Sequence, residues 1–303
     1  MSILVGVDAG ASHTEAVAAD RAMRELGRQS GAAGAVRPGS ESSSAAVIAE
    51  VIHGALAAAK LHGADAVAVG AAGAGREATR SALEAALRGA LGFSTSLKVT
   101  TDAEVALEAA FPGAAGIILI AGSGSIACGR DATGAVRRAG GWGARFGDEG
   151  SGYALASAAL NAVARAADGR GPPTALSDRL ATASRSRSLE ELIEWGHVAD
   201  HRAVAALAQH VCDAARGGDE VARGLVGRAA ADLAAHVAAL HQQLGSDAQV
   251  QVALSGGLLS PGSPVREALC EILRREMPGV GLMAEPVDPP LGAVCLAARL
   301  LEG

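Results

Sequence analysis

The sequence is short of aromatic residues, and its four cysteines stand alone. Phe, Trp and Tyr make up 2% of the 303 residues, while 50% of the chain is hydrophobic. A sizeable core is therefore expected, built from Ala, Val, Leu and Ile with closely packed backbones. The cysteines lack the spacing of zinc or iron–sulfur sites, which favours buried thiols at Cys128, Cys212, Cys270 and Cys295.

Lysine is nearly absent, and its absence excludes one large class of nucleotide site. The only lysines are Lys60 and Lys98, and neither lies in a G-x-x-x-x-G-K-[ST] loop. No G-x-G-x-x-G run opens a helix with an acidic residue about 20 positions later, so a dinucleotide fingerprint is also excluded. Arginine or a metal ion must therefore supply any positive charge that balances a bound phosphate.

The chain also lacks an excess of basic residues and any long apolar run. Its formal net charge of -6 and pI near 5.8 argue against nucleic acid or an anionic membrane as a partner. No apolar run is long enough to span a bilayer, and the N-terminal MSILVGVDAG lacks the basic region of a signal peptide. We therefore expect a globular, cytoplasmic protein with no nucleic-acid or membrane partner.

Short apolar runs alternate with longer segments of helical periodicity, and this alternation predicts an α/β fold. The predicted strands are residues 3–7, 16–19, 66–69, 96–100, 117–121, 126–129 and 250–254. The predicted helices are residues 44–59, 76–91, 102–110 and 218–244. The middle of the chain, from about 150 to 244, is almost wholly helical in pattern and indicates an added helical layer.

Three of the predicted strands end in turns of small residues. These turns lie in VDAGASHTEA (7–16), LIAGSGSIACG (119–129) and VALSGGLLSPGSPVREAL (252–269). Small residues leave backbone NH groups free to face an anion, and Asp8 at a strand end can hold a hydrated cation. Ordinary hairpin turns and helix-packing glycines explain each turn equally well. The three together favour a phosphate or nucleotide site.

A wider set of motifs resembles a known family. The motifs are DAGAS (8–12), TDAEVAL (101–107), AGSGS (121–125), GGWGARFGDEGSGYALA (140–156), GGDEVA (217–222) and LSGGLL (254–259). In this order they resemble the N-acetylglucosamine kinase branch of the BadF/BadG/BcrA/BcrD ATPase family, within the actin, Hsp70 and sugar-kinase superfamily. The resemblance implies two ribonuclease-H-like lobes, residues 1–112 with 289–303 and residues 113–288, with ATP and a sugar in an interlobe cleft. It also implies a homodimer.

The resemblance assigns roles to matching positions. Asp102 would be the catalytic base, and Asp8 would act on Mg²⁺ through water. The residues expected to bind ATP are Gly10, Ser12 and Thr14 in the first phosphate loop, Gly122, Ser123 and Gly124 in the second, and Gly218, Ser255, Gly256 and Gly257 around the adenosine. The residues expected to contact the sugar are Gly141, Trp142, Gly143 and Asp148.

Simpler structural roles compete with two of these assignments, and Glu149 beside them has a structural role of its own. Asp102 precedes a helical run and has the character of a helix N-cap. Trp142 is a candidate for the core. Glu149, next to Asp148, would support the sugar pocket or cap the helix that follows.

The implied reaction is phosphorylation of an amino sugar, N-acetylglucosamine to its 6-phosphate, by Mg-ATP. The family carries an Asn in a G-P-x-N-like segment, whereas this chain has Gly34 or Ala35 at that place, and His13 replaces a basic residue. Glucosamine, N-acetylmuramic acid, N-acetylmannosamine and glucose therefore stay open as substrates, with Arg37 or Ser40 as contacts. A non-catalytic sugar or ATP sensor is the alternative from another class. The lone cysteines argue against an iron–sulfur dehydratase activator, and the lack of a Cys-rich zinc motif argues against a ROK kinase.

Overall fold

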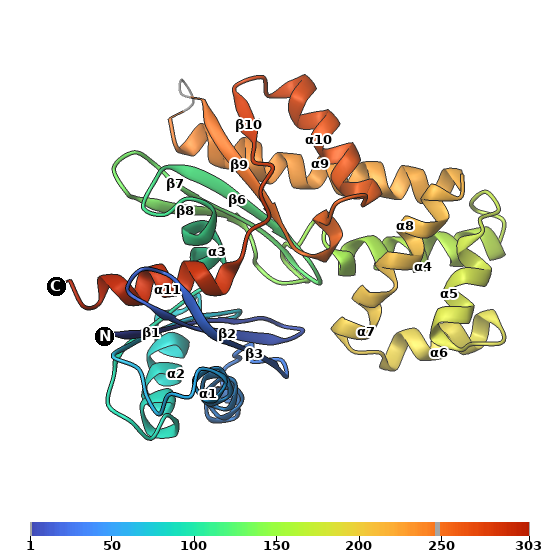
Figure 1. Cartoon of the computed structure of the whole chain (residues 1–303). Helices are drawn as coiled ribbons and strands as arrows, with labels where there is room; N and C mark the ends of the chain where they lie inside the picture. The colour runs from blue at the N-terminus through green and yellow to red at the C-terminus, as the bar shows by residue number, and fades with distance from the viewer. Residues whose placement is uncertain (1, 246–248, 303) are drawn as a thin grey trace. The chain divides into compact units, whose positions relative to one another are not determined.

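The computed structural model describes residues 2–245 and 249–302, and the chain forms two compact units (Figure 1). Unit 1 comprises Met1–Ala115 and Glu285–Gly303, and unit 2 comprises Gly116–Ala284. Each unit contains one five-stranded sheet.

Unit 1 is a mixed sheet with helices on both faces. Its elements are β1 (Ile3–Ala9), β2 (Thr14–Asp20), β3 (Glu25–Gly31), α1 (Glu41–Ala58), β4 (Ala66–Ala71), α2 (Glu77–Ala90), β5 (Ser96–Thr100), α3 (Asp102–Ala110) and α11 (Pro289–Arg299). The strand order is β3-β2-β1-β4-β5. The β1–β2 and β2–β3 pairs are antiparallel, whereas β4 and β5 run parallel to β1.

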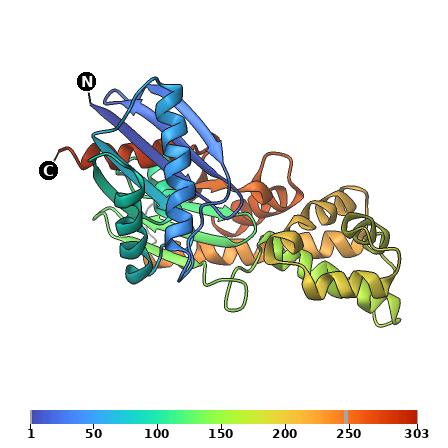
Figure 2. The ribbon, with the colours of Figure 1, turned by 90° about the horizontal axis from the view of Figure 1, so that it is seen from below.

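Alternation along β1 divides the core of unit 1 into two layers. Val5 and Val7 face α1 and α2, which Figure 2 shows side by side across one face of the sheet. Leu4 faces the opposite way and packs with Val105 of α3 and Val294 of α11. The period of two places successive side chains on opposite faces, so both faces of a fully buried strand must be apolar.

Unit 2 repeats the same sheet and adds a group of helices. Its elements are β6 (Gly116–Ala121), β7 (Ser125–Arg130), β8 (Val136–Gly140), α4 (Gly152–Ala167), α5 (Leu176–Ser184), α6 (Leu189–Val198), α7 (His201–Ala206), α8 (Ala208–Arg216), α9 (Glu220–Gln243), β9 (Val250–Ser255), a 3-10 turn (Gly257–Leu259), α10 (Pro264–Glu276) and β10 (Val280–Leu282). Read from the β8 edge, the order is β8-β7-β6-β9-β10, with antiparallel pairs on one side of β6 and parallel pairs on the other. Both units therefore share one ribonuclease-H-like topology, which confirms the predicted fold class.

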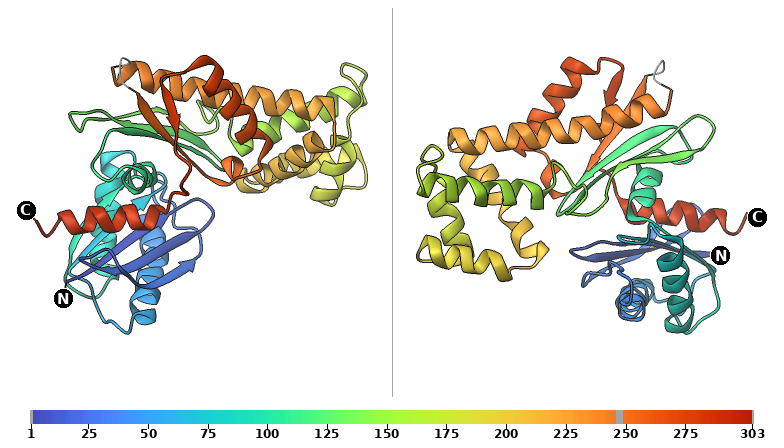
Figure 3. Two further views of the ribbon diagram at one scale, coloured as in Figure 1. Left: turned by 45° about the horizontal axis from the view of Figure 1, so that its top comes forward. Right: turned by 180° about the vertical axis from the view of Figure 1, so that it is seen from behind.

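Helix α9 joins the sheet of unit 2 to its helical group. Figure 3 shows α9 running from the strands to the helices α4–α8. The core includes Ile117 and Leu119 of β6, Leu155 of α4, and Leu233 and Val237 of α9. A single long helix thus contributes to both parts of unit 2.

The sequence predictions found the buried elements and missed the exposed ones. All seven predicted strands and four predicted helices exist. The edge strands β3 and β8 were missed because their sequences, ELGRQSG and VRRAG, are polar and largely exposed. The strand β10 has only 3 residues, too few for a pattern. The helical middle of the chain is broken into six helices, as the breaker DGRGPP between α4 and α5 indicates.

The sequence led us to expect buried cysteine thiols and no membrane-spanning segment. Cys128 and Cys212 are buried, and Cys270 and Cys295 are half-buried. Over residues 2–245 and 249–302, no helix has both the length and the apolar character that crossing a bilayer requires.

Gly6 of β1 allows α11 to lie against the sheet. Adding a side chain at Gly6 therefore tests how closely the helix packs. A Cβ at Gly6 would lie 2.2 Å from the Pro290 carbonyl oxygen and 2.3 Å from the Val294 nitrogen. Because both atoms are backbone, Gly6→Ala should lower the free energy of unfolding by about 3 kcal/mol. The matched change Gly89→Ala, in α2 where nothing lies within 4 Å, should raise it by up to about 1 kcal/mol. Urea unfolding of both variants checks this, and equal midpoints would contradict the packing described.

Candidate functional site

The parallel strands of unit 1 bring Asp8 and Asp102 to one edge of its sheet. Asp8 of β1 pairs with Gly70 of β4, and Gly70 pairs with Thr100 of β5. Asp102 follows Thr100 by two residues and begins α3. In open α/β sheets, ligands bind at the carboxyl ends of the strands. The two acidic residues that the sequence singled out thus lie at this edge.

Asp102 does not cap α3. The N-cap is Thr101, whose side chain accepts a hydrogen bond from the Glu104 nitrogen at 3.2 Å. The carboxylate of Asp102 accepts one from the Ala103 nitrogen at 2.9 Å. Burial raises the pKa of Asp102, against the opposing effect of the backbone hydrogen bonds. The N-cap interpretation of Asp102 is therefore wrong, and its half-buried carboxylate is a stronger base than an ordinary aspartate.

Asp8 lies partly buried among other acidic groups of unit 1. Burial, and then the negative charges of Asp102, Glu15 and Asp288, raise the pKa of Asp8 to about 7. Arg28 offsets part of this charge, since its guanidinium lies 2.7 Å from Asp288 and 3.1 Å from Glu15. A divalent cation would relieve the repulsion that remains.

The donor set at Asp8 fits Mg²⁺ held largely by water and phosphate. Among the described residues, no three His, Cys, Asp or Glu side chains gather as a ready-made metal site. Mg²⁺ usually keeps several waters and is bound through one or two carboxylates together with substrate phosphates. Asp8 and its neighbouring charge match that mode and do not match a cage made of protein ligands.

The first candidate phosphate loop is the tight turn between β1 and β2. The Gly10 nitrogen donates to the His13 carbonyl oxygen at 2.9 Å and closes the turn. The next NH groups, of Ala11 and Ser12, have no hydrogen-bond partner in the described part of the chain. Thr14 is fully buried at the start of β2. The NH groups of Ala11 and Ser12 are therefore available as donors in this loop.

The second candidate phosphate loop repeats this design between β6 and β7. The Gly122 nitrogen donates to the Gly124 carbonyl oxygen at 2.9 Å. The NH groups of Ser123 and Gly124 make no hydrogen bond with other described residues. The carbonyl oxygens of Gly122 and Ser123 accept from Gly152 and Tyr153 at the start of α4. Consecutive free NH groups in a turn form an anion-binding concavity.

Asp148 lies against the second loop in a strained backbone conformation. Its φ is 136°, which is rare outside glycine. Its carboxylate accepts backbone hydrogen bonds from Ser125 and Gly143, and burial nevertheless raises the pKa of Asp148. A Cβ at Gly124 would lie 3.0 Å from the Asp148 Oδ2. The geometry holds one carboxylate next to the phosphate loop.

Trp142 does not lie in the core, and Glu149 does not cap α4. Trp142 is 64% exposed and stacks on Arg138, whose Cζ lies 3.7 Å from the ring centre, so the core interpretation is wrong. The N-cap of α4 is Ser151, whose side chain accepts from the Ala154 nitrogen. Glu149 instead accepts from the Asp148 nitrogen at 3.2 Å. An exposed Trp beside a polar loop is available to a ligand.

The predicted adenosine residues fall into two groups. Ser255 pairs with Ile120 at the ends of the parallel strands β9 and β6. Gly256 has a φ of 93°, and a Cβ there would lie 2.4 Å from the Ala121 carbonyl oxygen, so this turn lies against the second loop. Gly218 lies elsewhere in unit 2, in the turn between α8 and α9, next to the N-cap Asp219.

The structure distinguishes between Gly34 and Ala35 as the position that corresponds to the missing Asn. A Cβ at Gly34 would lie 2.5 Å from the Thr14 Oγ1 and 3.0 Å from the Ile48 Cγ1, so Gly34 has no room for a side chain. Ala35 is half-buried, and its nitrogen donates to the Gly10 carbonyl oxygen at 3.2 Å. Ala35 is therefore the position at which an Asn side chain could stand in this fold.

Other polar residues near the loops escaped the sequence analysis. His201 stacks on Tyr153, with ring centres 4.4 Å apart, and its charge acts on Asp148. His236 of α9 lies 3.6 Å from Glu149. Neither histidine belongs to a motif, because each lies far along the chain from the residues that it contacts.

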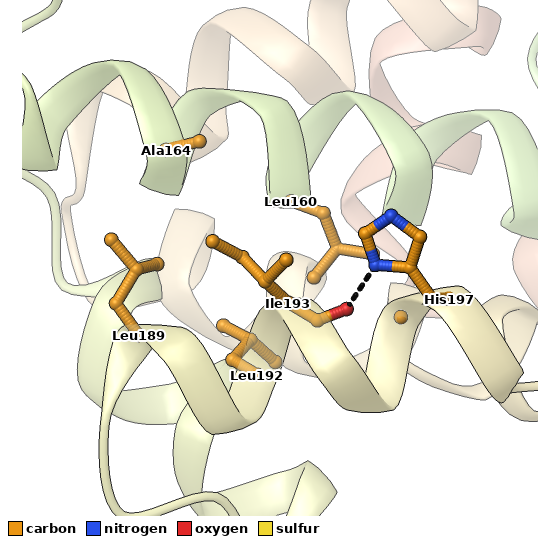
Figure 4. Close-up of a pocket in the computed structure, with 7 residues that line it drawn as sticks. Leu160, Ala164, Leu189, Leu192, Ile193 and His197 are labelled. Atoms are coloured by element: carbon orange, nitrogen blue, oxygen red, sulfur yellow. Dashed lines mark hydrogen bonds between the residues drawn. The ribbon is translucent and has the colours of Figure 1, made fainter.

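Two cavities lie in the helical group of unit 2, away from these loops. One, of about 220 Å³, is lined by Leu160 and Ala164 of α4 and by α6 residues that include Ile193 and His197 (Figure 4). The His197 Nδ1 lies 2.8 Å from the Ile193 carbonyl oxygen. The other, of about 370 Å³, includes Trp195 and Arg185. The first has an apolar lining and no convergent catalytic groups.

Comparison with known proteins places this architecture in a family. The sequence profile of the BadF/BadG/BcrA/BcrD ATPase family matches residues 5–297, and the chain belongs to this family. An N-acetylmuramic acid/N-acetylglucosamine kinase of Clostridium acetobutylicum is 32% identical over 77% of this chain and 76% of its own length. An N-acetyl-D-glucosamine kinase of Dictyostelium discoideum is 27% identical over 97% of both chains.

A solved structure agrees with these relatives. A protein of Chromobacterium violaceum, provisionally named as an N-acetylglucosamine kinase, superposes with a TM-score of 0.80 at 28% identity. The superposition covers 99% of this chain and 98% of the other. The agreement extends over both units.

The pKa of Asp8 predicts an unusual dependence of stability on pH. Because the folded value of about 7 lies above the ordinary 3.8, the folded protein keeps a proton that the unfolded chain releases. The contribution of Asp8 to stability should therefore fall as pH rises from about 4 to about 7 and then level off. Asp8→Asn should raise the free energy of unfolding by roughly 2–4 kcal/mol at pH 8 and by little near pH 4. Urea unfolding at several pH values measures this.

Asp131 provides a control of opposite sign. The hydrogen bond from Thr133 lowers the pKa of Asp131, so its charged form stabilises the fold. Asp131→Asn should lose stability at neutral pH, and the loss should vanish in acid. A gain of the same size in both variants would show that the Asp8 effect does not come from its charge.

Proposed function

We propose that this chain is an ATP-dependent kinase that transfers the γ-phosphoryl group to an amino sugar, N-acetylglucosamine at its 6-hydroxyl. The observation that carries the proposal is Asp102, a half-buried carboxylate that caps no helix and has a raised pKa at the same sheet edge as Asp8. The relatives named above act on N-acetylglucosamine according to their names, and this supports the choice of sugar.

Asp102 would accept a hydrogen bond from the sugar hydroxyl and take its proton. The hydroxyl oxygen then bonds to the γ-phosphorus as the bond to the bridging oxygen of ADP breaks. Asp8 would hold Mg²⁺ through water, and the ion would supply neutralisation of phosphate charge. The free NH groups of the two phosphate loops would donate to phosphate oxygens, while Trp142 and Asp148 would contact the sugar. ATP, Mg²⁺ and the homodimer implied by the resemblance remain predictions.

The catalytic role of Asp102 predicts a specific loss of turnover. Asp102→Asn keeps the shape of the side chain and removes the base, so the sugar-dependent rate should fall by roughly 10²–10⁴-fold. The measurement is ADP release from Mg-ATP with N-acetylglucosamine, glucosamine, N-acetylmannosamine, N-acetylmuramic acid and glucose. Glu104→Gln, a carboxylate loss on the same turn of α3, is the matched control and should change the rate by less than about threefold.

The panel also separates the kinase from a sensor. A sugar-dependent rate that disappears in Asp102→Asn supports the kinase and identifies its substrate. Binding of ATP and sugar by calorimetry, with no sugar phosphate formed on any member, would favour the non-catalytic sensor. Equal rates in wild type and Asp102→Asn would remove Asp102 from the mechanism.

N-acetylmuramic acid is a second candidate substrate, and Arg37 favours it. This sugar carries a carboxylate, and the relative from Clostridium acetobutylicum is named for both sugars. Arg37 is exposed, and within the described residues only its backbone makes hydrogen bonds, all of them with Ser40. Its segment lies at the sheet edge of Asp8, since Ala35 bonds to Gly10 and Val36 to Ala72. An unpaired guanidinium there suits an anionic substituent.

Removing the Arg37 charge should change the choice between the two sugars. Arg37→Gln should lower kcat/KM for N-acetylmuramic acid by roughly 3- to 10-fold and leave the value for N-acetylglucosamine within about twofold. Arg21→Gln, at the opposite end of the β1–β2 hairpin, is the control and should alter neither. Parallel losses for both sugars would mean that Arg37 does not contact the carboxylate.

A further inference from the structure

His236 lies buried beneath the segment that carries Trp142 and Asp148. It belongs to α9, is only 9% exposed, and its Nδ1 has no hydrogen-bond partner in the described part of the chain. Its Nε2 faces Gly140, where a Cβ would lie 2.6 Å away. The same Nε2 is 3.6 Å from the Glu149 Oε2. The imidazole is thus placed between α9 and both ends of residues 140–151, which we call the substrate loop.

Glu149 connects this histidine to the loop backbone. Its Oε2 accepts from the Asp148 nitrogen at 3.2 Å, and its carbonyl oxygen accepts from the Ser125 Oγ at 2.7 Å. Asp148 needs such support because its φ of 136° is unfavourable for a residue with a side chain. The contacts form one chain from His236 through Glu149 to Asp148.

The charged groups that act on Asp232 together with His236 come from the loop and from α9. Glu149 belongs to the loop, while Asp232 and Arg228 precede His236 on α9. Burial and the Glu149 charge raise the pKa of Asp232, and the charges of His236 and Arg228 lower it. Arg138 of β8 is engaged with the Gly140 carbonyl oxygen and the Trp142 ring. His236 is therefore the basic group on α9 that directly contacts the Glu149 carboxylate.

We propose that His236 is a positioning residue for sugar binding: through Glu149 it holds Asp148 and the substrate loop in the conformation that contacts the sugar. The inference rests on the proposed function, because Asp148 is assigned to the sugar there. His236 touches neither substrate nor phosphate in this role. A contact that acts on the ground state and transition state alike changes KM and leaves kcat nearly unchanged.

The kinetic test is a double-mutant cycle between His236 and Glu149. His236→Leu and Glu149→Gln should each raise KM for the sugar roughly 3- to 10-fold with kcat within about twofold, and the double variant should be no worse than the poorer single one. His241→Leu is the matched control, since His241 lies on the same helix, has no partner for its Nε2 among residues 2–245 and 249–302, and approaches Gly279 instead. It should leave KM unchanged.

A second measurement needs no sugar and no turnover. The chain has two Trp residues, Trp142 and Trp195, so Trp195→Phe leaves Trp142 as the single reporter of the substrate loop. In that background His236→Leu should shift the emission of Trp142 and raise its quenching by acrylamide, whereas His241→Leu should not. His236→Gln keeps a polar group near the Nε2 position and should restore part of the wild-type Trp142 emission. This recovery would show that the change in His236→Leu does not come from loss of folding.

These readouts separate the inference from the function on which it rests. If the wild type phosphorylates no sugar, the proposed function fails, and the Trp142 signal still decides whether His236 orders the loop. Additive effects on KM in the double variant would overturn the route through Glu149. An unchanged Trp142 signal in His236→Leu would overturn the positioning role itself.

Discussion

The candidate site of unit 1 depends on how closely α3 can lie between β4 and α11. A Cβ at Gly70 would lie 2.3 Å from Val105 Cγ2, and a Cβ at Gly292 would lie 2.1 Å from the Val105 carbonyl oxygen. Val105 therefore packs between two glycines, Gly70 of β4 and Gly292 of α11. Because Asp102 is three residues before Val105 on the same short helix, this packing also sets the position of Asp102 beside Asp8. The relative position of these two carboxylates therefore depends on core packing.

The two units carry candidate phosphate loops of the same design. In each, the hairpin between the first two strands begins with a glycine whose NH closes the turn, and the next two NH groups are left free. Equivalent topology places the equivalent hairpin at the carboxyl edge of the parallel strands. Backbone donors carry no net charge, so this solution needs a metal ion or arginine to balance a polyphosphate, which agrees with a chain that has only two lysines. The acidic surroundings of Asp8 suit the metal ion better than a cationic side chain.

Local sequence patterns predicted what depends on local structure. The buried strands and the helix of residues 220–243 follow from apolar periodicity, and the turns at Gly10, Gly122 and Gly256 follow from small residues after strands. The edge strand β3 and the short β10 escaped because their pairing depends on a neighbour and not on their own side chains. The same limit applies at the site: TD at Thr101 and Asp102 offers two possible caps, and only the backbone shows that Thr101 takes the role. His236 contacts a loop about 90 residues earlier in the chain, and no short motif encodes such a contact.

The substrate loop combines strain with weak local support, and this gives its surroundings a role in function. Asp148 has an unfavourable φ, Trp142 is exposed, and the loop glycines at Gly141 and Gly143 have positive φ values. A loop of this kind has little intrinsic preference for one conformation, so contacts from the rigid elements below it must select the conformation that binds. The hydrogen bonds to Ser125 supply one anchor from the sheet, and His236 supplies another from α9. In the proposed role of this loop, residues that never touch the sugar set its affinity, because the free energy needed to order the loop is subtracted from the free energy of binding.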